Sequence, residues 1–250
     1  MLSNVAINQI LSHINWTDLP KSIAYAKFPI KNVPSSKWSL VNRVIMVSSG
    51  TLDQRGRNQW ADVQRYPIKG SKPNWIICPQ VHSETIEGES KKICDGFIGI
   101  PVYAADATYG DPITYEFVSE QVFNTESISE KWDNRVKGIY KRYEISTAYH
   151  EHYEPAGDNE KQFFWNTSLF AYKELFTNHA NRADKRIVCE LSALALLNMC
   201  GRSVNYPGKH YSMIQYYARD LKLSTMGAFM NIIKNVDLVL TTVLDIGLTD

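Results

Sequence analysis

The stretches Asn74-Trp75-Ile76-Ile77-Cys78-Pro79 and Phe97-Ile98-Gly99-Ile100-Pro101-Val102 are two short apolar runs marked by proline and glycine. Runs of this length and composition are typical of β-strands. The segment between them, Ser83 to Lys92, is polar and contains glycine, which predicts a hairpin connection. Residues 38–118 therefore predict a mixed α+β unit whose sheet is antiparallel.

The pattern changes from about residue 119, because the later segments carry apolar residues at helical spacing. These segments are 163–177, 185–200, 211–221 and 226–244. Residues 1–19 carry the same spacing, whereas residues 38–46 fit a helix or a strand equally well. We expect an α+β protein with two domains. Residues 1–118 form a mixed α+β domain with a small antiparallel sheet, and residues 119–250 form a mainly helical domain.

Composition places the chain among ordinary globular proteins, since it has 250 residues, of which 44% are hydrophobic and 21% charged. Its four cysteines form no CxxC pair, which predicts a reduced, cytoplasmic protein without a zinc ribbon. The N-terminus does not read as a signal peptide. The apolar stretches near 191–197 and 236–244 are too short to span a bilayer, so we expect no membrane partner.

The formal net charge is only +1, but the charges are unevenly distributed. Residues 31–72 contain eight Lys or Arg against two acidic residues, and residues 84–133 contain three Lys against eleven acidic residues. Such an asymmetry predicts a local basic face, even though the whole protein is nearly neutral.

Residues 55–75 interleave cationic and aromatic side chains. Single-stranded nucleic acid is held by cations that follow its phosphates and by aromatic faces that stack on its bases, each stack contributing roughly 1–3 kcal/mol. The alternative is that Trp60 and Trp75 are core residues and the cations a solvated rim. The candidate DNA-binding residues are Arg43, Arg55, Arg57, Gln59, Trp60, Arg65, Tyr66, Lys69, Lys72 and Trp75.

An ordered series of short motifs spans about residues 38–113. The series is Asn42, Gln59-Trp60, Ile68-Lys69-Gly70-Ser71-Lys72, Trp75-Ile76-Ile77-Cys78-Pro79, Gly96-Phe97, Pro101-Val102-Tyr103 and Thr108-Tyr109-Gly110. In order and spacing it resembles the N-terminal domain of the ArdC antirestriction family. That family is carried by conjugative plasmids and phages. The resemblance implies binding of single-stranded DNA without sequence specificity, in the host cytoplasm, and protection of incoming DNA from restriction.

The C-terminal half resembles the zinc-peptidase-like, or zincin-like, helical domain of the same family. The segment Phe170 to Leu175 lies where the family has His-Glu-Leu-x-His, which puts Lys173 and Thr177 at the two histidine positions. Glu174 and Glu190 remain. A lysine ammonium group only donates hydrogen bonds and repels a cation, so the donor set is wrong for zinc. The resemblance therefore implies a catalytically inactive peptidase domain without a metal or other cofactor. In such a domain Lys173 would pair with Glu174 or Glu190.

Other histidines offer a weaker metal hypothesis. His150 and His152, at i and i+2, share a face on a strand but not on a helix, and His179 matches a histidine of the family that is not a ligand. Two other functions stay open. The chain could be a structural or interaction protein of a phage, inside the virion or as a decoy for a host restriction or defence protein, docking through residues 84–133. It could also be a working peptidase that uses Glu174.

Overall fold

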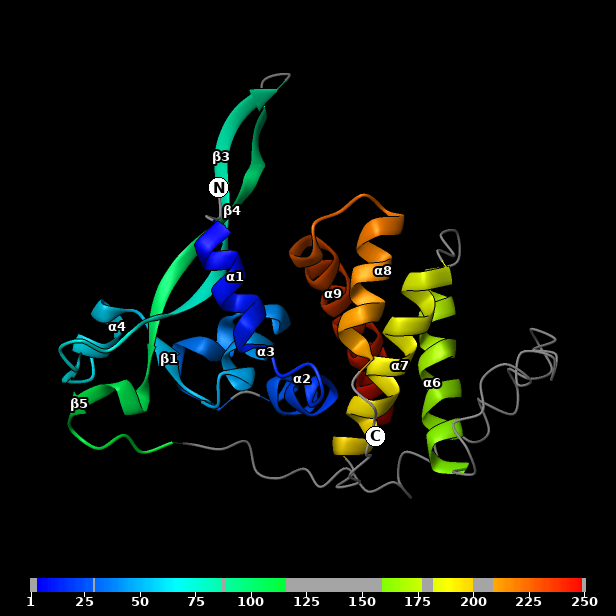
Figure 1. The fold of residues 1–250 in the computed structure, drawn as a ribbon, viewed down its shortest axis with the longest axis horizontal. Helices are drawn as coiled ribbons and strands as arrows, with labels where there is room; N and C mark the ends of the chain where they lie inside the picture. The colour runs from blue at the N-terminus through cyan, green and yellow to red at the C-terminus, as the bar shows by residue number, and fades with distance from the viewer. Residues whose placement is uncertain are drawn as a thin grey trace. The chain divides into compact units, whose positions relative to one another are not determined.

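The computed structural model describes residues 4–28, 30–86, 89–115, 159–176, 182–199 and 209–248. The chain divides into two compact units, one of residues 1–15 with 28–118 and one of residues 16–27 with 119–250 (Figure 1). The predicted domain boundary between residues 118 and 119 lies outside the described residues. Residues 16–27, which we placed in the N-terminal domain, group with the helical unit instead.

The N-terminal unit contains two small antiparallel sheets, as expected for an α+β fold. One sheet has the strand order β1-β4-β3 and the other pairs β2 with β5. The elements are α1 (Asn4–His13), η1 (Pro34–Lys37), α3 (Leu40–Ser48), β1 (Gln54–Arg55), α4 (Arg57–Ala61), β2 (Arg65–Pro67), β3 (Asn74–Ile86), β4 (Glu89–Ala104), η2 (Ala105–Ala107) and β5 (Thr108–Gly110).

Strands β3 and β4 form a long hairpin that extends well past the two apolar runs (Figure 1). Their apolar ends pair with Ile76 opposite Ile100, and the register shifts between Gln80 and Val81. The polar residues beyond this shift continue the same ladder up to Ile86 opposite Glu89. Hydrophobic patterning alone does not reveal this distal part, because its side chains are exposed and only backbone pairing defines it.

Helix α3 packs on β3 and resolves the ambiguity of residues 38–46 in favour of a helix. Ser39 is its N-cap, with a side chain that accepts a hydrogen bond from the backbone N–H of Asn42. Val44 and Ile45 are buried on its inner face. The helix thus covers one side of the sheet formed by β1, β4 and β3.

The second unit is a helical bundle. Four of its five helices match the segments predicted from the periodicity, whereas the fifth, α2, was not predicted. They are α2 (Leu19–Lys27), α6 (Asn159–Leu175), α7 (Arg182–Met199), α8 (His210–Asp220) and α9 (Thr225–Leu248). Helix α7 contacts the other four, so it is the central helix of the bundle (Figure 1). Lys27 of α2 forms an ion pair with Asp237 of α9 at 2.8 Å.

Helix α9 is longer than the apolar stretch at 236–244 that lies within it. By length and composition, Thr225–Leu244 could cross a membrane, with a mean hydropathy of 1.3. Half of that segment is buried within the protein, which is typical of the core helix of a bundle.

Candidate nucleic-acid interface

Trp60 is a large, fully buried side chain of the N-terminal core. Its indole N–H donates to the backbone carbonyl of Tyr103 at 2.9 Å. The guanidinium groups of Arg55 and Arg65 lie 4.8 Å and 5.9 Å from the centre of its ring. Because no face of the indole reaches solvent, Trp60 cannot stack on a DNA base in this structure. The alternative prediction, that Trp60 is a core residue, is the one that the burial supports.

Arg55 is likewise an internal residue. Its Nη2 lies 2.8 Å from Oδ2 of Asp53, and its Nε also donates to that carboxylate. The two side chains are 5% and 2% exposed, so a DNA phosphate could not reach this guanidinium. Burial, the charge of Asp53 and a hydrogen bond to Asp53 raise the pKa of Tyr115, which adds a third polar group to this buried pair. The predicted contact of Arg55 with DNA is therefore corrected to a structural role.

Arg65 binds the backbone of its own unit. Its guanidinium donates to Oγ1 and to the carbonyl of Thr108, and to the carbonyls of Ala105, Gly110 and Asp111, at 2.6–3.3 Å. These bonds hold the segment of β5 against β2. The guanidinium is thus engaged on the chain itself, and we remove Arg65 from the candidate DNA contacts as well.

Arg43 and Trp75 are both half-buried. Arg43 donates from Nη1 to the carbonyl of Ser36 at 3.2 Å. Trp75 pairs with Pro101 in the β3–β4 ladder. Both side chains contribute to the packing of α3 and of the sheet, so neither is a leading candidate for contact with DNA.

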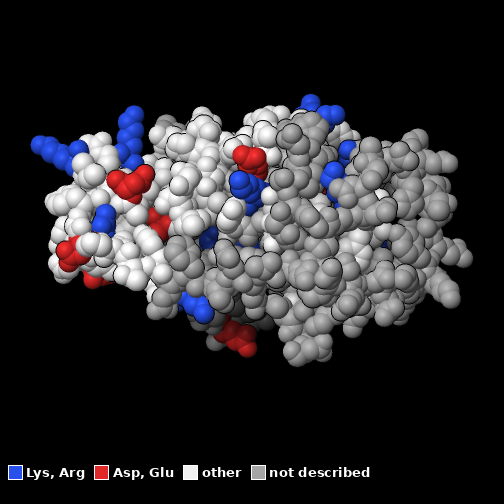
Figure 2. Space-filling model, turned by 90° about the horizontal axis from the view of Figure 1, so that it is seen from below, with Lys and Arg blue, Asp and Glu red and all other residues white. Residues whose placement is uncertain are grey.

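The remaining candidates lie at the surface: Arg57, Gln59, Tyr66, Lys69 and Lys72 are all exposed. Gln59 accepts a hydrogen bond from the backbone N–H of Gly56 at 3.0 Å and so caps α4. Arg57 donates from Nη2 to Oη of Tyr103 at 3.1 Å. Figure 2 shows basic side chains projecting into solvent at the end of this unit that carries α4, β2 and β5, with acidic side chains among them.

Tyr66 and Tyr109 form an exposed aromatic pair. They lie directly opposite each other in the β2–β5 ladder, their ring centres are 6.1 Å apart, and they are 45% and 60% exposed. Tyr66 is one of the DNA-binding residues predicted from the sequence, whereas Tyr109 is only part of the Thr108-Tyr109-Gly110 motif. The pairing of β2 with β5 brings residues 43 positions apart together, and no local pattern announces it.

The β2–β5 pairing depends on Gly110, which has a positive φ of 135°. A Cβ at this position would come within 2.2 Å of the carbonyl oxygen of Gln64. No larger residue fits between the two strands, so Gly110 is the position that permits their close approach.

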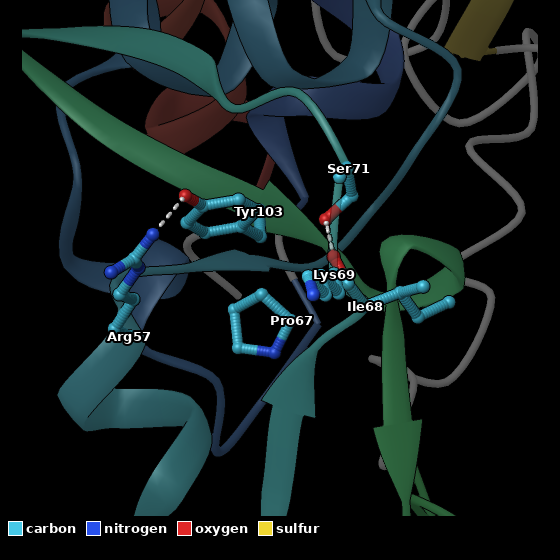
Figure 3. Close-up of a pocket in the computed structure, with 7 residues that line it drawn as sticks. Arg57, Pro67, Ile68, Lys69, Ser71 and Tyr103 are labelled. Carbon is cyan, nitrogen blue, oxygen red and sulfur yellow. Dashed lines mark hydrogen bonds between the residues drawn. The ribbon is translucent and has the colours of Figure 1, made fainter.

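A pocket of about 380 Å³ adjoins β2, lined by Arg57, Pro67, Ile68, Lys69, Gly70, Ser71 and Tyr103. In Figure 3 the rings of Pro67 and Tyr103 face the pocket, with Arg57 on one side and Lys69 on the other. Two cations and two apolar rings around one hollow can accept an anion that carries a flat group.

Comparison with solved structures finds the metal-free crystal structure of the antirestriction ArdC protein from plasmid R388. The TM-score is 0.52 at 14% sequence identity, over 92% of this chain and 98% of that chain. The protein has an ArdC-like fold. The Mn(II)-bound structure of the same plasmid protein gives a TM-score of 0.49 at 12% identity, over 82% of this chain and 84% of that one. No protein-family model and no curated protein sequence matches this chain.

The described residues that the sequence resemblance aligns with a peptidase motif lie on α6 and α7. Lys173 is half-buried and Glu174 exposed near the end of α6, whereas Glu190 is buried on α7. Thr177, His150, His152 and His179 lie outside the described residues. Within the described ranges, no group of three His, Cys, Asp or Glu side chains could hold a metal ion. At position 173 an ammonium group stands where the resembled motif has an imidazole, and an ammonium group does not bind zinc.

A different polar cluster joins α6, α7 and α9 in the interior of the helical unit. The hydroxyl of Tyr172 donates to Oδ2 of Asp184 at 3.0 Å, and the amide of Asn235 donates to the same oxygen at 3.3 Å. Burial raises the pKa of Asp184, and the two hydrogen bonds counter this shift only in part. Sequence reasoning missed this cluster, because its three members come from three helices.

His210 is a further buried titratable group of the helical unit. Its Nδ1 donates to the carbonyl of Trp16 at 3.3 Å, and its Nε2 lies 3.7 Å from Oε1 of Glu190. Burial lowers the pKa of His210, which favours the neutral imidazole. The imidazole therefore packs in the interior of the unit, between the carbonyl of Trp16 and the carboxylate of Glu190.

Proposed function

We propose that the protein binds single-stranded DNA without sequence specificity and protects it from host restriction, with the N-terminal unit as the DNA-binding part. The observation that carries this proposal is the combination of exposed cations and an exposed aromatic pair on one short stretch of structure. The cations are Arg57, Lys69 and Lys72, and the aromatic pair is Tyr66 with Tyr109. We call these five residues the DNA surface.

The cations would supply most of the affinity, since released counterions drive binding to the phosphate backbone. The tyrosine pair would supply the preference for unpaired strands, because the faces of bases in a duplex are covered by their neighbours. Arg55, Arg65 and Trp60 contribute indirectly by holding β2, β5 and α4 in place. The proposed surface is therefore smaller than the set of candidates from the sequence.

The proposal of an antirestriction role rests on the fold, which is shared with a plasmid protein named as antirestriction ArdC. The helical unit would then be an inactive peptidase-like body. Lys173 at a metal-ligand position of the motif supports this part, since its positive charge can replace a metal between carboxylates. Stoichiometric, tightly bound zinc in the purified protein would overturn it.

A fluorescence-polarisation titration tests the DNA surface. The ligands are a labelled single strand and the corresponding duplex, each at two salt concentrations. We expect tighter binding of the single strand. We also expect the variant Arg57→Ala/Lys69→Ala/Lys72→Ala to bind at least tenfold more weakly, with a salt slope smaller by about 2, since each phosphate contact on a single strand contributes about 0.7.

The matched control removes the same charges from exposed positions of the helical unit, in the variant Arg219→Ala/Lys222→Ala/Lys234→Ala. Its affinity should stay within twofold of the unmodified protein. Equal losses in both variants would show that net charge alone, and not the DNA surface, drives binding. The biological role is tested by transferring DNA into a restricting host that contains either the unmodified protein or the first variant. Only the unmodified protein should raise transfer.

A further inference from the structure

The pocket beside β2 is distinct from the tyrosine pair, because Tyr66 and Tyr109 do not line it. Its volume of about 380 Å³ lies within the range of about 300–1,000 Å³ in which proteins hold small ligands. Two of its lining residues, Arg57 and Lys69, belong to the DNA surface, so it lies where a bound strand would pass. The question is what part of the strand it receives.

Arg57 is positioned for an anion at the edge of this pocket. Its Nη2 donates to Oη of Tyr103 at 3.1 Å, and its guanidinium carbon lies 5.6 Å from the centre of the tyrosine ring. The guanidinium group has five N–H donors, and within the described residues one of them is used, in this bond to Tyr103. The tyrosine thus restricts the guanidinium to the mouth of the pocket, and the other donors stay available for phosphate oxygens.

The turn at the opposite side is held in place by its own bonds. The hydroxyl and the backbone N–H of Ser71 both point to the carbonyl of Ile68, at 2.7 Å and 3.0 Å. Gly70 allows the turn through its φ of 90°, and the N–H of Ile68 donates to the carbonyl of Ala107. A turn fixed in this way loses little entropy when a ligand binds, and it presents Lys69 toward Arg57 across the pocket (Figure 3).

Two rings line the pocket together with the two cations. The pyrrolidine ring of Pro67 and the ring of Tyr103, which is 6% exposed, face the hollow (Figure 3). Such walls match a sugar or a base better than a second phosphate. We propose that the pocket receives one nucleotide of an unpaired strand, with its phosphate between Arg57 and Lys69 and its base against Pro67 and Tyr103. This inference rests on the proposed function and names the part of the DNA that the site selects.

A nucleotide in a duplex enters such a pocket only after it leaves the stack, which costs a few kcal/mol. A single strand has no base pairs to break. The pocket therefore adds a second source of preference for unpaired DNA, independent of stacking on the tyrosine pair.

An NMR titration of the full-length protein with thymidine 5′-monophosphate tests this inference, because it detects weak binding at identified residues. We expect saturable shifts at the backbone amides of residues 68–71 and at the side chain of Arg57. Thymidine and inorganic phosphate, tested separately, should each give shifts at least fivefold smaller at the same concentration. Equal shifts with phosphate alone would contradict a nucleotide pocket and indicate a simple anion site.

Lys69 and Lys72 provide a matched pair of variants, since both are exposed and three residues apart but only Lys69 lines the pocket. Lys69→Glu should abolish the shifts caused by the mononucleotide, whereas Lys72→Glu should retain them. Both variants should weaken binding of a long single strand. Loss of mononucleotide binding in both, or in neither, overturns the pocket assignment.

The same samples separate the two proposals. If the long single strand binds but the mononucleotide gives no localised shifts, the nucleotide pocket is wrong and the DNA surface stands. If neither ligand binds, both proposals fail together. Folding of each variant is checked by the unchanged spectrum of residues far from the pocket.

Discussion

The side-chain amide of Asn42 in α3 makes both hydrogen bonds that a neighbouring strand would offer to Ile77 in β3. Its Nδ2 donates to the carbonyl of Ile77, and its Oδ1 accepts from the N–H of Ile77, both at 2.8 Å. One polar side chain thereby fastens the helix to the sheet in the buried interior. This contact explains physically why an asparagine stands at the first position of the ordered motifs.

The first prediction concerns this contact. Asn42→Ala leaves a buried N–H and a buried carbonyl of Ile77 without partners, which costs about 1–3 kcal/mol for each group. We expect the free energy of unfolding of the N-terminal unit to fall by about 2–5 kcal/mol in a urea titration. Asn58→Ala, at an exposed position, is the control and should change it by less than about 0.5 kcal/mol.

The second prediction separates two arginines that are two residues apart. Arg55→Ala leaves Asp53 as a buried charge without its guanidinium partner, which costs about 3–5 kcal/mol of stability. Arg57→Ala removes an exposed side chain, so stability should change by less than about 1 kcal/mol while single-stranded DNA binds more weakly. Urea titration and fluorescence polarisation on both variants check the contrast. Equal stability of the two variants would refute the structural role of Arg55.

The third prediction concerns the close approach of β2 and β5. Gly110→Ala forces a methyl group against the carbonyl of Gln64, so the two strands must separate. Gly96→Ala is the control, since Gly96 has a similar φ of 140° but nothing within 4 Å of the added carbon. Both variants bear backbone strain of about 1–3 kcal/mol. Only Gly110→Ala should also weaken DNA binding, because it moves Tyr109 away from Tyr66.

The fourth prediction tests stacking on the tyrosine pair. Tyr109→Ala should weaken binding of single-stranded DNA by about 1–3 kcal/mol, which is roughly fivefold or more, whereas Tyr109→Phe should keep most of the affinity. Tyr216 on α8 is also 60% exposed, so Tyr216→Ala removes an equally exposed ring from the helical unit. If both alanine variants bind like the unmodified protein, the aromatic pair plays no part in binding.

The fifth prediction concerns pH. Burial lowers the pKa of His210 in the folded protein below its ordinary value of about 6.5. The unfolded chain then binds more protons than the folded one, so the stabilising contribution is present above pH 6.5 and is lost as the pH falls through the folded pKa. His210→Gln should flatten this part of the stability profile of the helical unit, measured by urea titration between pH 5 and 8.

Asp184 acts in the opposite direction. Its raised pKa means that the folded state holds a proton that the unfolded state has released. Its contribution to stability is therefore present below about pH 3.8 and is lost as the pH rises through the folded pKa. Comparing Asp184→Asn with His210→Gln distinguishes the two groups, because the slopes that they remove have opposite signs.

The secondary structure could be predicted where hydrophobic residues have a clear period. Helices α6, α7, α8 and α9 and the apolar ends of β3 and β4 follow directly from such patterns, because burial of one face dictates the spacing of apolar side chains. The distal hairpin and the β2–β5 pair could not be predicted. Backbone hydrogen bonds between distant residues define them, and these bonds leave little trace in the identity of the side chains.

By itself the sequence determined the class of the fold, the basic character of residues 31–72 and the presence of a lysine at position 173, where the resemblance aligns a histidine. Only the tertiary structure decided which cations face solvent. Arg55 and Arg57 are alike in type and nearly adjacent, yet one is bound to Asp53 beneath Trp60 and the other is exposed beside Tyr103. The reason is that burial depends on neighbours brought together by folding, whereas charge belongs to the residue alone.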